Sequence, residues 1–144
     1  MRIQSWHRAA AAGLALLGWP APAWPAATPA QLNASYPAEV ALDEEGDKGF
    51  LFRRFPGAQR LYTYDRDGKN QSSCNADCDG PRPPVYTACD SKPMPDWTIV
   101  KRYNGLCQWA YQGRPLYTYY HDLPSDPQGD REGGVWHLLG YIKP

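Results

Sequence analysis

The residues of this sequence best suited to chemistry are aromatic, and four of them form two equally spaced tyrosine pairs. Their rings could stack on a ligand ring or a sugar face, and their phenolates could hold the iron of a haem. Aromatic pairs on neighbouring strands also stabilise sheets, so packing is the competing interpretation. Together with two tryptophans, the candidates for a binding face are Tyr62, Tyr64, Tyr117, Tyr119, Trp109 and Trp136.

Two histidines and a methionine are the candidates for a transition-metal site. Imidazole and thioether groups suit copper or zinc, and His121, His137 and Met94 supply them. The sequence does not show that the three side chains converge. No cofactor is therefore predicted, and copper, zinc or haem is kept as the alternative.

An acidic loop near the C-terminus has the carboxylates that calcium prefers. It contains Asp122, Asp126, Asp130 and Glu132. Their spacing does not match a loop that places its ligands at alternate positions. Asp is also common in turns, so we interpret this segment as a solvated loop.

Four cysteines in a small exported chain favour two disulfides, and four cysteines allow three pairings. We expect Cys74 to pair with Cys78 and Cys89 with Cys107. The alternative is a zinc site with four thiolates, but the chain has one close pair, spaced Cys-x3-Cys, and two solitary cysteines.

The elements that must position these residues are strands. Apolar residues at helical spacing do not persist beyond a turn after residue 31, so little helix is expected. Asn104-Gly105 lies between the β-rich runs 97–103 and 106–111, which predicts a hairpin with a type I′ turn. A second reversal is predicted at Gln112-Gly113, and a third at Pro56-Gly57 between 50–52 and 61–64. Strands are also expected at 85–89 and 135–139.

An internal repeat is the most informative pattern. Residues 61–67 reappear as residues 116–122, 55 positions later, with five of seven residues identical. Gly57 precedes the first copy and Gly113 the second. Asp67 and Asp122 close the copies, where a carboxylate can accept backbone N–H groups and define a turn. We therefore expect a single domain, mostly β, of antiparallel hairpins or a meander in two related halves, with disulfides as staples.

This doubled pattern, Tyr-x-aromatic-x-x-Asp, resembles a family of bacterial secreted repeats of unknown function, also described as predicted lipoproteins. Cys74-x3-Cys78 with Pro83-Pro84 after the first copy, the segments 105–111 and 113–117, and the tail 129–137 resemble it too. The resemblance implies an extracytoplasmic bacterial protein of two repeats, and no established activity. Three features depart from the pattern: Arg82 stands where the family often has Trp, Cys89 and Cys107 are additions, and a lipid-attachment cysteine is missing.

The first residues have the pattern of a signal peptide. Arg2, His7 and Arg8 precede the apolar run 9–19, which is shorter than the roughly 20 residues of a membrane span. We predict a signal peptide over 1–27, with cleavage between 23 and 30, an N-terminal segment over 28–48, and a two-repeat β domain over 49–144. The copies are expected near 49–89 and 97–139. The mature chain should be periplasmic or secreted, soluble, and without a membrane span.

Composition narrows the function classes. With 15 basic and 15 acidic residues the formal net charge is zero, which disfavours nucleic-acid binding. The motifs of serine hydrolases, zinc proteases, phosphate loops and dinucleotide sites do not occur in the sequence. We therefore expect a non-catalytic binding or interaction module with an unknown ligand or partner. The alternative is an extracytoplasmic accessory protein that handles metal or haem.

Overall fold

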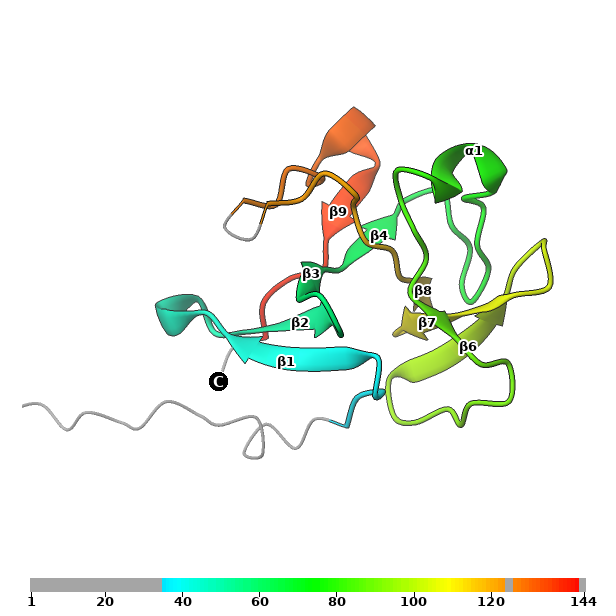
Figure 1. The fold of residues 1–144 in the computed structure, drawn as a ribbon, viewed down its shortest axis with the longest axis horizontal. Helices are drawn as coiled ribbons and strands as arrows, with labels where there is room; N and C mark the ends of the chain where they lie inside the picture. Colours follow the sequence, from blue (N-terminus) through cyan, green and yellow to red (C-terminus); the bar gives the residue numbers. More distant parts are fainter. Residues whose placement is uncertain (1–34, 124–125, 143–144) are drawn as a thin grey trace, which may run out of the picture.

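The computed structural model describes residues 35–123 and 126–142, and the predicted signal peptide lies outside these residues. Short antiparallel strands dominate, as expected (Figure 1). The elements are β1 (Val40–Glu44), the 3₁₀ turn η1 (Gly46–Lys48), β2 (Phe50–Arg54), β3 (Gln59–Arg60), β4 (Tyr62–Tyr64), α1 (Ala76–Asp79), β5 (Tyr86–Thr87), β6 (Trp97–Lys101), β7 (Cys107–Tyr111), β8 (Arg114–Pro115), the 3₁₀ turn η2 (Glu132–Gly134) and β9 (Trp136–Leu138).

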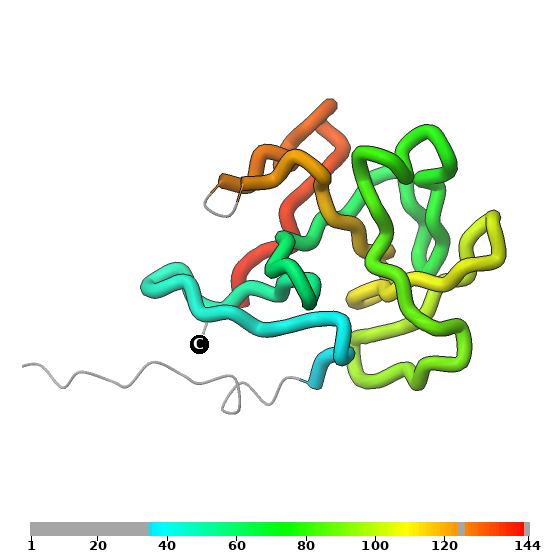
Figure 2. Tube along the Cα trace, in the orientation of Figure 1, coloured from blue at the N-terminus to red at the C-terminus, as the bar shows by residue number. Residues whose placement is uncertain are grey.

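These strands form three antiparallel sheets. β1, β2 and β3 form the first, and β4 pairs with β9 in the second. In the third, β7 lies between β6 and β5 and also pairs with β8. The chain path in Figure 2 shows β4, in the middle of the sequence, alongside the C-terminal segment that contains β9.

Two hairpins, β1–β2 and β6–β7, have the same construction. Each pairs five residues with five. In the connecting loops Glu45 N–H donates to Gly49 O at 2.8 Å, and Arg102 N–H donates to Leu106 O at 2.8 Å. The strand pairing and this loop hydrogen bond therefore recur in both parts of the chain, although the positive φ values fall at Gly46 and Gly49 in the first loop and at Gly105 in the second.

The hairpin predicted at Asn104-Gly105 is confirmed, but its turn type is corrected. Asn104 does not have a positive φ, whereas Gly105 has φ 82° and its N–H donates to Arg102 O at 3.0 Å. This is the three-residue loop in which a turn is followed by a left-handed glycine. This loop has one residue more than a two-residue type I′ turn, and it therefore needs only one residue with a positive φ.

The two-residue turn lies at the second predicted reversal. Gln112 and Gly113 have φ values of 50° and 80°, and Tyr111 pairs with Arg114 across them. Two consecutive positive φ values are the requirement of a type I′ turn. A Cβ on Gly113 would also come within 3.0 Å of the Lys69 side chain, so the position favours glycine twice over.

The third predicted hairpin is confirmed in part. β2 does reverse through Pro56-Gly57, but it pairs with β3 and not with the strand 61–64. β4 pairs instead with β9, and Tyr62 forms a bridge with Tyr117. The chain changes its pairing partner at Leu61, between β3 and β4. Leu61 is fully buried in the core, and its carbonyl accepts the Leu139 N–H at 2.8 Å.

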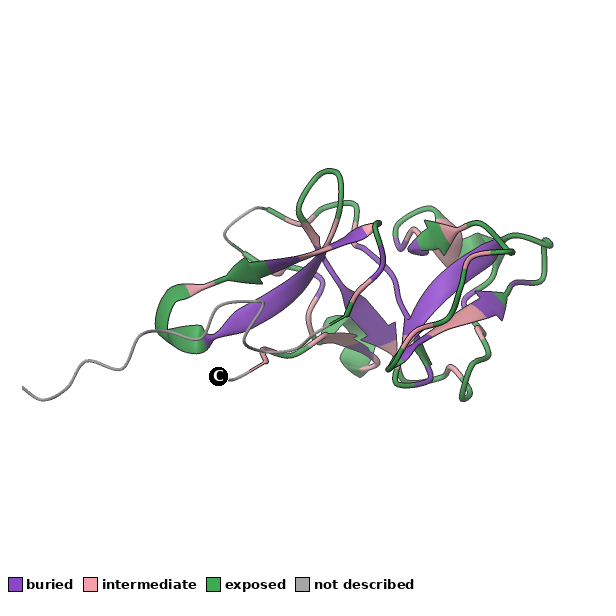
Figure 3. Cartoon of the chain, turned by 90° about the horizontal axis from the view of Figure 1, so that it is seen from below, coloured by how far each residue is buried: buried purple, intermediate pink, exposed green. Residues whose placement is uncertain are grey.

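The main core lies between the two hairpins. Phe52 of β2 meets Trp97 of β6 edge to face, with centroids 5.1 Å apart, and packs against Tyr111 of β7 at 5.4 Å. Val40 and Leu42 of β1, which the sequence analysis did not predict to be a strand, complete this core. In Figure 3 the buried positions run along the strands in the middle of the molecule, while the loops are exposed.

Both expected disulfides are present. Cys74 and Cys78 join across the start of α1, and Cys89 joins Cys107 of β7. The second bond joins cysteines at the larger sequence separation, 18, and ties the segment after β5 to the third sheet. Among the described residues, no helix has both the length and the apolar character that a membrane crossing needs.

Glu45, in the β1–β2 loop, accepts hydrogen bonds from two buried arginines and a tyrosine. Arg53 pairs with it, Arg60 Nη1 donates at 3.1 Å, and the Tyr141 hydroxyl donates at 2.7 Å. Burial alone would raise the pKa of Glu45. The Tyr141 hydrogen bond and the arginines outweigh it and hold the pKa below its usual value.

We predict that Glu45→Gln lowers the free energy of unfolding by about 1–3 kcal/mol at neutral pH, because the buried arginines lose the carboxylate that they share, although Asp43 still pairs with Arg53. A carboxyl with a lowered folded-state pKa stabilises the fold above its unfolded-state pKa, and that stability is lost as the pH falls through the folded-state pKa. Urea unfolding of both proteins should therefore converge under acidic conditions. Glu44→Gln, on an exposed neighbour, is the control; an unchanged gap at acidic pH would contradict the prediction.

Candidate functional site

The two repeated segments meet through equivalent residues. Tyr62 N–H donates to Tyr117 O at 2.8 Å, and Tyr117 N–H donates to Tyr62 O at 3.0 Å. The first tyrosine of each copy is thus paired with the first tyrosine of the other. Both side chains are fully buried, in a second cluster that also contains Cys74 and Trp136.

The closing aspartates extend this exchange to the side chains. The Tyr62 hydroxyl donates to the Asp122 carboxylate, at 2.6 Å to Oδ2, and the Tyr117 hydroxyl donates to Asp67 Oδ2 at 2.9 Å. Each copy therefore contributes the donor of one hydrogen bond and the acceptor of the other. The aspartates also accept backbone N–H groups as expected, Asp67 from Ser73 at 2.7 Å and Asp122 from Gly129 at 3.2 Å.

The protonation of these phenols follows from their surroundings. Burial, and then the carboxylate of Asp122, raise the pKa of Tyr62 far above its usual value. Burial and the nearby Asp67 likewise raise the pKa of Tyr117, against the opposing hydrogen bond with Ser72. Both phenols act as hydrogen-bond donors to these carboxylates.

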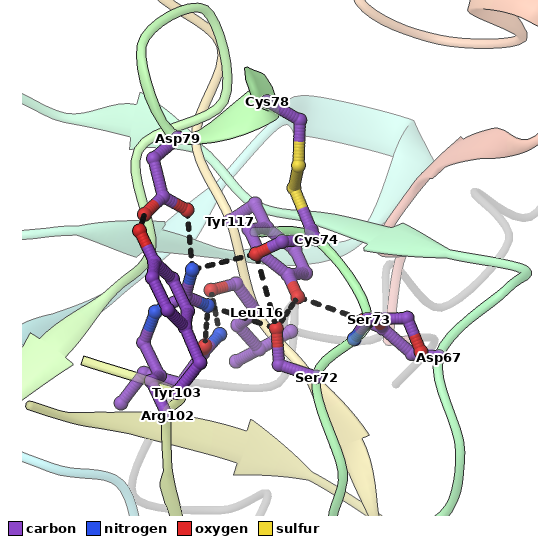
Figure 4. The surroundings of a disulfide bond; sticks show 11 residues. Asp67, Ser72, Ser73, Cys74, Cys78, Asp79, Arg102, Tyr103, Leu116 and Tyr117 are labelled. Carbon is purple, nitrogen blue, oxygen red and sulfur yellow. Dashed lines mark hydrogen bonds and ion pairs between the residues drawn. A yellow bond between two sulfur atoms is a disulfide. The ribbon is translucent and has the colours of Figure 1, made fainter. Parts of the chain in front are cut away.

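Asp67 and Tyr117 connect to a buried arginine that the sequence analysis missed (Figure 4). Ser72 Oγ lies 2.7 Å from the Tyr117 hydroxyl and accepts from Arg102 Nη1 at 2.9 Å. Arg102 Nη2 also donates to the Cys74 carbonyl at 2.6 Å, and the guanidinium pairs with Asp79 and contacts Gln108. One side chain of the β6–β7 turn thus holds the Cys74–Cys78 loop in place.

A second buried arginine, Arg82, lies among aromatic rings. Its guanidinium carbon is 3.9 Å from the Tyr119 ring centroid, 4.4 Å from that of Trp136 and 5.1 Å from that of Tyr62. It donates to Gly129 O at 2.9 Å and pairs with Glu132. Its side chain is almost fully buried, so the stacking takes place away from water.

Arg82 and Trp136 occupy equivalent places in the two halves. The residue before each accepts a backbone N–H from the other repeat segment: Pro81 from Tyr120 at 3.0 Å, and Val135 from Asp65 at 2.9 Å. Trp136 stacks on Tyr64 with centroids 4.4 Å apart, as Arg82 stacks on Tyr119. The sequence feature that pointed to this position was Arg82 itself, because the family that the chain resembles often has Trp there.

The other candidate residues are dispersed. Trp109 is buried in the main core and donates to Glu39 at 3.1 Å. Met94 packs against the same core, while His121 is exposed beside Tyr119. His137 lies 2.6 Å from Asp65.

The acidic loop residues accept hydrogen bonds within the fold. Asp130 Oδ1 accepts the Leu138 N–H at 2.8 Å, and Glu132 pairs with Arg82. Within residues 35–123 and 126–142, the one group of His, Cys, Asp or Glu ligand atoms close enough to hold a metal is Cys74, Cys78 and Asp79. Both cysteines are in a disulfide, and neither candidate histidine belongs to the group.

Two pockets lie at equivalent places between the halves. The Tyr64 pocket, of about 440 Å³, lies between residues 64–65 and 67–69 of the first half and the turn 112–115 of the second. The Arg60 pocket, of about 330 Å³, lies between Arg53 with the turn 57–60 of the first half and residues 122–123 of the second. Each combines a positive-φ turn from one half with the motif aspartate of the other. Both volumes are in the range of small-molecule sites.

Comparison with known proteins supports the resemblance. Residues 98–139 match the family model described as a secreted repeat of unknown function. The match begins at Thr98 in β6, runs through β9 and includes the second motif copy. No curated protein and no solved structure matches the chain.

We predict that Tyr62→Phe and Tyr117→Phe each lower the free energy of unfolding by about 1–3 kcal/mol, because each leaves a carboxylate without its phenol donor. Urea unfolding measures the loss. Tyr86→Phe, at an exposed tyrosine, should change stability little. Equal stability of all three variants would contradict a role for the exchanged hydrogen bonds.

We predict that Arg82→Lys lowers the free energy of unfolding by about 1–3 kcal/mol, because an ammonium group cannot replace a planar guanidinium stacked among three rings. Arg131→Lys is the matched control, since the Arg131 side chain is 87% exposed. Thermal unfolding should show a lower midpoint for the first variant alone. A drop of the same size in both would show that the aromatic stacking is not the cause.

Proposed function

Since residues 98–139 carry a secreted repeat, we propose that this chain is an exported, non-catalytic binding module that takes a small ligand at the junction of two repeats. The observation that carries the proposal is the Tyr64 pocket, which neither half forms alone. Localisation in the periplasm or outside the cell belongs to the same proposal. It is supported by the signal-peptide pattern and the family's description as secreted.

The two-repeat organisation is supported by backbone equivalence. β1–β2 with β3 and β6–β7 with β8 share pairing and loop hydrogen bonds, and the motif copies exchange their Tyr–Asp bonds. On this basis the first repeat begins with β1, upstream of residue 49. A shared interface between copies then provides the place where a ligand touches both.

The proposal of a module without catalysis is supported by how the reactive side chains are used. Tyr62 and Tyr117 are buried donors to carboxylates, and the four cysteines are in disulfides. The His137–Asp65 pair is exposed, and among the described residues no hydroxyl or thiol is hydrogen bonded to its ring. These groups support and shape the fold, whereas the pockets remain open to a ligand.

The test is an NMR screen of the exported protein against a mixed library of small polar molecules: sugars, amino acids and carboxylic acids. We expect at least one class to shift the signals of Tyr64, Asp65 and Arg114 while leaving the main core unchanged. Binding to a preformed pocket alters its lining and little else.

Two readouts would overturn this function. One is a complete lack of shifts at the Tyr64 pocket across the library. The other is conversion of any bound molecule during prolonged incubation, followed by the same spectra, because a binding module returns its ligand unchanged.

A further inference from the structure

We propose that the Tyr64 pocket binds an uncharged carbohydrate, one or two pyranose units in length. This rests on the proposed function and adds the chemical class of the ligand. The inference comes from the lining of the pocket: one aromatic ring, polar groups of both kinds, and balanced charge.

The aromatic component is Tyr64. It is half-buried, lines the pocket, and is fixed by its stack on Trp136, whose ring plane is tilted by 22°. A tyrosine held in this way presents an apolar, amphipathic surface at little entropic cost. The C–H face of a pyranose ring is complementary to such a surface.

The polar component is a loose ion pair. Arg114 Nη2 lies 3.9 Å from Asp65 Oδ1, and their side chains are 54% and 46% exposed. Asp65 is fixed on its other side by His137 at 2.6 Å. Sugar hydroxyls both donate and accept, so one hydroxyl pair can donate to the carboxylate and accept from the guanidinium.

The charge of the lining disfavours anions. Lys69 and Arg114 contribute two positive charges, and Asp65 and Asp67 contribute two negative ones. Asp67 is already hydrogen bonded to Tyr117 and Ser73. A phosphate would need a surplus of positive charge, whereas a neutral polyol needs donors and acceptors in comparable numbers.

The Arg60 pocket provides a comparison within the same chain. It has the equivalent backbone, but no aromatic residue lines it, and its charged lining residues are Arg53, Arg60 and Asp122. Both arginines are already paired with Glu45, which lies outside the lining. Gln59 stands at the position that corresponds to Arg114 in the repeat. A carbohydrate should therefore occupy the Tyr64 pocket and leave the Arg60 pocket free.

The experiment is an NMR titration of the exported protein with three probes: maltose, cellobiose and N,N′-diacetylchitobiose. We expect at least one to saturate, with a dissociation constant on the order of 1 mM, and to shift Tyr64, Asp65 and Arg114. Arg114→Ala should weaken binding about tenfold, because a charge-assisted hydrogen bond is lost. Gln59→Ala, in the Arg60 pocket, should leave the affinity within about twofold.

A second variant tests the ring. Tyr64→Leu keeps an apolar side chain beside Trp136 and removes the aromatic face, and its unfolding midpoint is measured alongside. We expect it to abolish saturation at pH 7 while remaining folded. If it unfolds, the Arg114→Ala result decides the proposal.

The outcomes separate the two proposals. If amino acids or carboxylic acids shift Tyr64 and Arg114 while none of the three sugars does, the carbohydrate inference is overturned and the binding module stands. Sugar shifts that map to the Arg60 pocket overturn the inference as well. If no small molecule shifts the Tyr64 pocket, both proposals fail.

Discussion

The hydrogen bonds exchanged between Tyr62 and Asp122 and between Tyr117 and Asp67 are the constraint on which the rest of the structure depends. A buried phenol or carboxylate without a partner costs free energy, and here each half holds the partner for the other. Neither half alone can bury its tyrosine and also supply the carboxylate to which the hydroxyl donates. The pairing of the two motif strands, the course of the aspartate loops and the position of both pockets follow from this exchange.

Two buried arginines show how the side chains of the two halves differ around that shared frame. Arg82 fills the place that Trp136 fills in the other half, and it stacks on the equivalent tyrosine. The guanidinium is flat, as the indole is, but it carries a charge, and Glu132 and the Gly129 carbonyl are placed to receive it. Arg102 makes a similar set of contacts with the Cys74 carbonyl and Asp79. A buried charge stays in place only with such partners, so each arginine fixes a nearby loop.

The local features of the fold were predictable from the sequence, and the contacts between distant segments were not. The β6–β7 hairpin, the Gln112-Gly113 reversal and the two disulfides depend on turn residues and cysteine spacing. β1 was not predicted because it has only two buried apolar residues, Val40 and Leu42. Two alternating apolar positions are too short a pattern to indicate a strand. The Tyr–Asp exchange joins residues 50 and 60 positions apart, and either aspartate could have served only its own turn. Nothing in the chain marks Arg102 as buried, whereas Arg82 was visible as a departure from the family's tryptophan.

The equivalence of the two halves separates what the backbone determines from what the side chains determine. The backbone places a positive-φ turn against an aspartate loop twice, and so produces two pockets. The first turn has Gln59 and Arg60 where the second has Arg114 and Pro115, and only the second pocket includes a tyrosine. Since the frame is common to both, a difference in ligand between the pockets must come from these few side chains. Under the proposed function, the ligand preference can change at the lining while the exchanged tyrosines and aspartates keep the fold constant.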